Sequence, residues 1–126
     1  MSSARFLALG DSYTIGEQVD AGARWPVQLA AMLRAGGTRV DDPEIIATTG
    51  WTTDELAAGI ARASPVGPYA LVSLLIGVNN QYRGRQLATY DAEYRALLAQ
   101  AIEFAGGVAG RVIVLSIPDW GVTAFA

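Results

Sequence analysis

The sequence of 126 residues contains no histidine, no cysteine and no lysine. The absence of cysteine excludes disulfides, thiolate nucleophiles and cysteine-ligated zinc. The absence of histidine removes the side chain that most often serves as a general base near neutral pH. Any hydrolytic function of this chain must therefore account for the missing base.

Clusters of positive charge and long hydrophobic runs are also absent. All nine basic residues are arginines spread along the chain, and the net charge is −3, so we expect no nucleic-acid partner. No apolar run approaches the roughly 20 residues of a membrane span, and the N-terminus does not resemble a signal peptide. We expect no membrane partner and a cytoplasmic location, or export followed by signal removal. Hydrophobic residues make up 52% and charged residues 17% of the chain, which excludes a disordered protein.

Apolar segments and helical patterns alternate along the chain. Thr52 and Glu55 match a capping box, Pro26 lies in the first turn of an earlier helix, and glycines follow two of the helices. The predicted strands are residues 6–9, 43–50, 70–77 and 111–118, and the predicted helices are residues 25–37, 52–65 and 90–104. Four alternations in one short chain predict a single domain over residues 1–126.

This alternation predicts the α/β class, with three layers (α/β/α) and a parallel sheet in the flavodoxin-like order 2-1-3-4. Ligands of such sheets bind at the carboxyl ends of the strands. Ser12 follows the first strand, Gly50 the second and Asn79 the third. We therefore expect these three residues to meet at one edge of the sheet, with Ser12 in the middle.

Three ordered segments carry a family resemblance: "GDSYTIG", "TTGWTTDEL" and "IGVNNQYRG". They resemble the first three sequence blocks of the SGNH hydrolases, also called GDSL esterases and lipases. The resemblance implies that Ser12 is the nucleophile. It also implies an oxyanion hole formed by the backbone N–H groups of Ser12 and Gly50 and the side-chain amide of Asn79.

The residue types suit this chemistry. Gly50 has no Cβ, so its N–H can approach a bound carbonyl closely, and Asn79 is a donor that cannot be lost by deprotonation. Taken singly, Asp11, Ser12, Gly50 and Asn79 are typical of turns and helix caps. Their joint placement favours a catalytic site, with Asp11 as a structural acceptor. Asn80 stands where the family more often has Asp.

Several neighbouring residues have two interpretations each. Trp51 and Tyr82 are candidate substrate-binding residues that could wall an acyl pocket, or they are packing residues. Arg83 and Arg85 could hold an acidic substrate, but we predict a solvated surface pair. Asp119 could be offered as a triad acid, but a turn role is predicted.

The resemblance also implies a catalytic Asp and His in a D-x-x-H block after a fifth strand, and the sequence contains no such block. We therefore expect a C-terminally incomplete domain that lacks the fifth strand and the last helix. Its expected partners are a small ester substrate and either a second fragment carrying the Asp/His block or a homo-oligomer that covers the fourth strand. No cofactor and no metal are expected.

Two functions remain open. One is a serine ester hydrolase acting on small esters through a Ser12 acyl-enzyme. The other is a non-catalytic domain that keeps the oxyanion pocket and binds a small carboxylate or acetylated ligand. A flavodoxin-like nucleotide or signalling domain is disfavoured, because the first loop lacks a glycine-rich phosphate cradle.

Overall fold

The protein contains one parallel sheet of four strands. The structure, a computed structural model, describes residues 3–117. Its strands are β1 (Phe6–Gly10), β2 (Glu44–Ala47), β3 (Leu71–Leu75) and β4 (Val112–Val114), in the order β2-β1-β3-β4. All three strand pairs are parallel. The predicted fold class and strand order are therefore confirmed.

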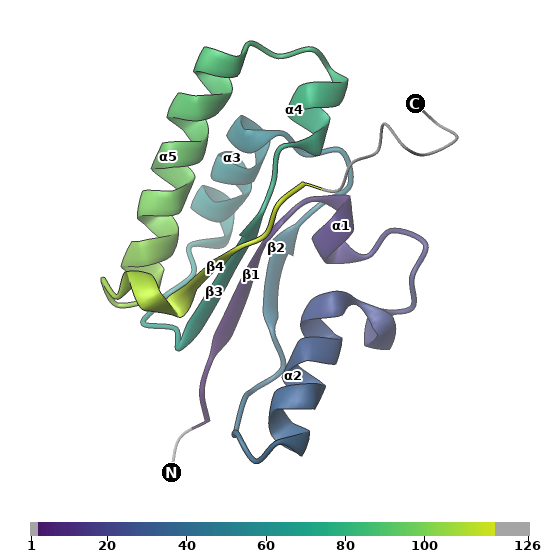
Figure 1. Cartoon of the computed structure of the whole chain (residues 1–126), viewed down its shortest axis with the longest axis vertical. Coiled ribbons are helices and arrows are strands. Elements are labelled where there is room, and N and C mark those ends of the chain that lie inside the picture. Colours follow the sequence, from purple (N-terminus) through teal and green to yellow (C-terminus); the bar gives the residue numbers. More distant parts are fainter. Residues whose placement is uncertain (1–2, 118–126) are drawn as a thin grey trace.

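Helices cover both faces of this sheet. They are α1 (Ser12–Ile15), α2 (Trp25–Ala35), α3 (Thr53–Ala63), α4 (Val78–Tyr82) and α5 (Leu87–Phe104), with short 3-10 turns η1 (Ala21–Ala23) and η2 (Ala109–Arg111). Figure 1 shows α3 and α5 on one side of the sheet and α1 and α2 on the other. The three predicted layers are present.

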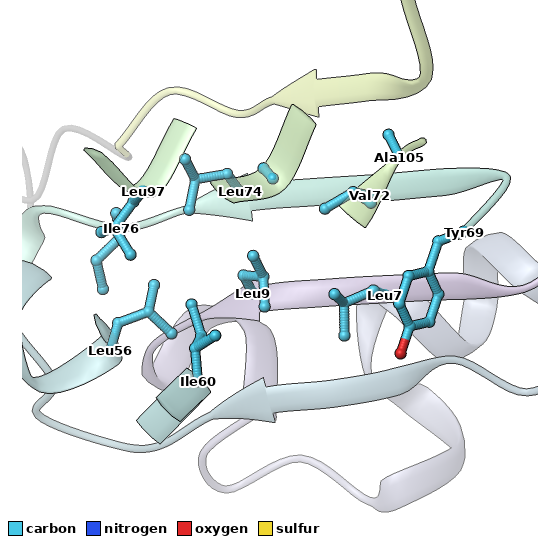
Figure 2. Close-up of a cluster of buried hydrophobic side chains, with 11 residues drawn as sticks. Leu7, Leu9, Leu56, Ile60, Tyr69, Val72, Leu74, Ile76, Leu97 and Ala105 are labelled. Atoms are coloured by element: carbon cyan, nitrogen blue, oxygen red, sulfur yellow. The ribbon is translucent and has the colours of Figure 1, made fainter. Parts of the chain in front are cut away.

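The central strand β1 is buried along its whole length, as expected for a strand covered on both faces. Its side chains alternate between two apolar clusters. Phe6 and Ala8 pack with Ala30 on the α2 side. The larger cluster lies beneath α3 and α5 and includes Leu7, Leu9, Leu56, Ile60, Val72, Leu74 and Leu97 (Figure 2).

Several element boundaries differ from the prediction: β2, β3 and β4 are shorter than the predicted strands, and α4 and α5 differ from the predicted helices. Residues 78–82 form α4, where a loop was expected, because a helix of one turn is too short to show an apolar period. Helix α5 starts at Leu87 rather than Tyr90, and Leu87 is 78% exposed, so the apolar pattern could not mark that turn. Strand β4 has only three residues, although Leu115 still donates its N–H to Leu74 O at 3.0 Å.

A polar clamp holds the sheet together at the amino ends of its strands. The buried Tyr69 donates its hydroxyl to a Glu44 carboxylate oxygen, and the other oxygen of Glu44 pairs with Arg5 at 2.9 Å. The Arg5 guanidinium lies 4.2 Å from the centre of the Tyr69 ring. This clamp joins the start of β2 to residues just before β1 and β3, at the opposite end of the sheet from Ser12.

The clamp makes stability depend on pH. Burial alone would raise the pKa of Glu44, but the hydrogen bonds from Tyr69 and Arg5 outweigh it and lower that pKa below its ordinary value of 4.5. The folded chain therefore binds this proton less readily than the unfolded chain. The stabilisation is complete above about pH 4.5 and is lost as the pH falls through the lowered value.

We predict that Glu44→Gln lowers the free energy of unfolding at pH 7 and that its deficit relative to wild type shrinks below pH 4.5. Urea unfolding at pH 3, 5 and 7 measures this. Glu103→Gln, which removes the same charge from an exposed site on α5, is the control and should show no such trend. A deficit of equal size at all three pH values would contradict the proposed role of the carboxylate.

Candidate active site

The first strand turns sharply into α1 at Gly10. A Cβ atom at Gly10 would lie 2.7 Å from Leu75 O and 2.8 Å from Thr14 Cβ, so any larger residue would force α1 away from the strand ends. Asp11 is the N-cap of α1, and Ser12 is its first residue. The absence of a side chain at Gly10 therefore places Ser12 immediately beyond the carboxyl end of the central strand.

Asp11 has the structural role that was predicted for it. Its carboxylate accepts the Tyr13 N–H at 3.0 Å, and the residue is only 1% exposed. Burial raises the pKa of Asp11 to about 6, while the hydrogen bond from Tyr13 opposes this shift. At pH 7 Asp11 is mainly ionised and caps the helix that begins with Ser12.

The loop after β2 contains Gly50 in the left-handed region, with φ +87°, where a side chain would be strained. The peptide after Gly50 is anchored at both ends. Its N–H, from Trp51, donates to Thr48 O at 3.3 Å, and its carbonyl, from Gly50, accepts from Arg83 Nη2 at 2.5 Å. This loop leads into α3 through the predicted capping box, in which Glu55 accepts the Thr52 N–H at 3.0 Å.

Helix α4 presents two asparagines to this loop. Asn79 Nδ2 donates to Trp51 O at 3.0 Å. Asn80, which is 3% exposed, accepts the Thr53 N–H at 3.1 Å and donates to Thr53 Oγ1 at 2.9 Å. An Asp at position 80 could accept from both Thr53 groups, so the amide found here performs the same joining role. The loops after β2 and β3 are thus joined directly.

The structure brings Asn79 into contact with the residue that follows Gly50. Ser12 begins α1 at the same end of the sheet, and α1 contacts both β1 and β2 (Figure 1). Among residues 3–117, no protein acceptor takes the N–H of Ser12 or of Gly50. The side-chain amide of Asn79 has two hydrogens, and the bond to Trp51 uses one. Ser12 N, Gly50 N and Asn79 Nδ2 therefore each have a hydrogen that no group among residues 3–117 accepts.

Trp51 and Tyr82 lie in different surroundings. The Trp51 ring packs against α3, where a Cβ at Gly59 would come within 2.8 Å of Trp51 Cζ3. This contact accounts for Trp51 as a packing residue, and a role in binding an acyl group stays a prediction. Tyr82 is 73% exposed, and its binding role is likewise a prediction. Asp119 lies outside the described residues.

The prediction of a solvated pair of arginines misses their contacts. Arg83 pairs with Glu55 at 3.1 Å in addition to its bond to Gly50 O, and Arg85 pairs with Asp54 at 3.3 Å. Both acids lie in the first turn of α3. The acidic first turn was visible in the sequence as part of the capping motif. The arginines come about 30 residues later in the chain, so the sequence pattern could not predict that they pair with these acids.

The model of the GDSL-like lipase/acylhydrolase family matches residues 8–126. The chain belongs to this family. No curated protein matches it.

Several solved structures share the fold of this chain. AlinE4, described as an esterase of the SGNH-hydrolase family, is 24% identical, with a TM-score of 0.69, and the match covers 94% of this chain and 62% of AlinE4. The psychrotrophic esterase EstA from Pseudoalteromonas sp. is 17% identical, with a TM-score of 0.65, and the match covers 92% of this chain and 62% of EstA. The chain therefore spans less than two thirds of the length of these relatives.

Within residues 3–117, no helix has the length and apolar character needed to cross a membrane.

The contact between Trp51 and Gly59 predicts that a Gly→Ala substitution in a helix destabilises the chain, which is the opposite of the usual effect. Gly→Ala inside a helix normally stabilises it by about 1 kcal/mol. We expect Gly59→Ala to lower the free energy of unfolding instead, by about 1–3 kcal/mol, because the new methyl group overlaps the indole ring. Urea unfolding measures the change.

The matched control adds Gly59→Ala to a Trp51→Leu background, where the ring is absent. There the same substitution should stabilise the chain. Stabilisation by Gly59→Ala in the wild-type background would contradict the packing described for Trp51.

Proposed function

We propose that this chain carries the nucleophile and the oxyanion hole of a serine hydrolase that acts on small esters. The observation that carries the proposal is the set of unused donor hydrogens on Ser12 N, Gly50 N and Asn79 Nδ2 at the end of the sheet where Ser12 begins α1. Membership of the GDSL-like lipase/acylhydrolase family supports it. Donors that need no other partner can stabilise a developing oxyanion without reorganisation.

In the proposed reaction, Ser12 Oγ attacks the acyl carbon of the ester while a base takes the hydroxyl proton. The carbonyl oxygen gains negative charge, which the three donors stabilise. The bond to the alcohol then breaks, the alcohol leaves with that proton, and water hydrolyses the acyl-Ser12 ester. Removing one oxyanion donor typically costs about 100- to 1,000-fold in kcat.

We propose that the base comes from outside these 126 residues, since they include no histidine, the side chain that most often serves as a general base near neutral pH. Asp11 is not a substitute, because its carboxylate is buried and caps α1 through the Tyr13 N–H. We propose that a second polypeptide segment with an Asp-x-x-His sequence supplies the base. Strand β4, which has β3 as its one partner among residues 3–117, is the edge we propose it covers, since Ile113 and Val114 there are 43% and 49% exposed.

The missing histidine also favours a second candidate function. The same three donors could bind a small carboxylate or an acetylated ligand without turnover. Titration with acetate, followed by the amide signals of Ser12 and Gly50 in an NMR spectrum, tests this candidate. Shifts that saturate in wild type and vanish in Asn79→Ala would favour binding.

We predict that, when a polypeptide carrying the Asp-x-x-His segment is supplied, Ser12→Ala abolishes the hydrolysis of p-nitrophenyl acetate that this segment restores and abolishes fluorophosphonate labelling. Asn79→Ala should lower kcat by about 100-fold with a modest change in KM, because the donor acts on charge that develops in the transition state. Steady-state kinetics measures both variants. Undiminished activity of Ser12→Ala would exclude it as the nucleophile.

We also predict that the 126-residue chain alone is a very poor esterase. An oxyanion hole and substrate binding without the triad leave about 1,000- to 10,000-fold acceleration over water in other serine hydrolases. The assay compares the chain, with its mass confirmed, before and after a polypeptide carrying the Asp-x-x-His segment is supplied. Full turnover by the confirmed chain alone would refute the account of the missing base.

A further inference from the structure

Arg83 ends α4 and connects it to the loop after β2. It is the C-cap residue of α4, and its Nη2 donates to Gly50 O at 2.5 Å. The same nitrogen lies 3.1 Å from Glu55 Oε1. A single guanidinium group therefore links three elements: the end of α4, the Gly50 loop and the first turn of α3.

Two successive peptide groups after Gly50 are fixed at both of their polar ends. The first has its carbonyl on Arg83 and its N–H on Thr48 O. The second, between Trp51 and Thr52, has its carbonyl on Asn79 Nδ2 and its N–H on Glu55 Oε1. The Gly50 N–H lies just before this fixed segment and has no acceptor within residues 3–117.

The backbone of Gly50 does not by itself determine the direction in which its N–H points. Gly50 lies at φ +87°, and without a Cβ it samples positive and negative φ about equally in a free chain. The direction of its N–H therefore depends on groups that hold the peptide after it. Arg83 is the side chain that holds the Gly50 carbonyl.

Glu55 keeps Arg83 in place. Its Oε1 accepts from Thr52 N and Thr52 Oγ1, each at 3.0 Å, in addition to its pairing with Arg83. These hydrogen bonds from Thr52, together with the positive charge of Arg83, lower the pKa of Glu55 below its ordinary value, so this carboxylate is ionised at neutral pH. The capping box of α3 thus also serves as the anchor for a residue from α4.

We propose that Arg83 is a positioning residue of the oxyanion hole, which holds the Gly50 carbonyl so that the Gly50 N–H is presented to the substrate oxygen. This inference rests on the proposed function. Arg83 acts through Gly50, because both contacts of its Nη2 are with protein groups. The Nη2 group carries two hydrogens, one for each of these contacts.

The test compares Arg83→Met with Arg85→Met. Both remove one positive charge from neighbouring arginines whose side chains are 39% and 38% exposed, and both arginines pair with an acid in the first turn of α3. Only Arg83 contacts the Gly50 carbonyl. Arg83→Lys, which keeps the charge but not the fork, is the conservative variant.

Two readouts are measured on each variant. The first is Ser12-dependent hydrolysis of p-nitrophenyl acetate with the polypeptide carrying the Asp-x-x-His segment supplied, and with the rate of the matching Ser12→Ala double variant subtracted. The second is hydrogen exchange of the Trp51 amide, which belongs to the peptide that Arg83 holds. We expect Arg83→Met to lower kcat about tenfold with KM nearly unchanged and to speed Trp51 exchange about tenfold. Arg83→Lys should give intermediate values, and Arg85→Met should match wild type in kcat and exchange.

A failure of the inference about Arg83 can be distinguished from a failure of the proposed function. Ser12-dependent turnover that Arg83→Met leaves unchanged overturns the inference and leaves the proposed function intact. A rise in KM with unchanged kcat also overturns it, since Arg83 would then bind substrate. If no variant, the wild-type chain included, shows Ser12-dependent turnover, the proposed function fails. In that case, unchanged exchange of the Trp51 amide in Arg83→Met would also refute the proposal that Arg83 holds the Gly50 carbonyl.

Discussion

The position of β1 between β2 and β3 is the constraint on which the rest of the structure depends. This strand pairs with both neighbours in parallel and is buried on both faces. Parallel pairing sends all the strand ends to one edge of the sheet, and the central position of β1 places the turn after it between the other two loops. The apolar residues of "FLALG" thus determine where the polar residues after them can act.

The edge beyond the strands is held by polar contacts among loops and short helices. Asn80 joins α4 to the start of α3, Asn79 joins α4 to Trp51, and Arg83 joins α4 to Gly50. The large apolar cluster lies between the sheet and the two long helices α3 and α5 (Figure 2). Apolar burial therefore supplies the frame, and directional hydrogen bonds set the finer geometry of the candidate site.

Local signals predicted most of the elements correctly. Pro26 lies in the first turn of α2, and Thr52 with Glu55 forms the capping box of α3, because both features depend on residues within one helical turn. Strand β3 was recognisable as a continuous apolar segment. Helix α4 was missed because one turn shows no period, and its contacts come from residues about 30 positions earlier.

The sequence by itself determined the class of fold and the strand order, because apolar runs, caps and glycines act over a few neighbouring positions. It also determined that no histidine is available within these 126 residues. Only the tertiary structure decided that Trp51 packs on Gly59 and that Arg83 reaches the Gly50 carbonyl. Those contacts join segments that are far apart in the chain, and their partners become neighbours only when parallel strands bring their carboxyl ends together.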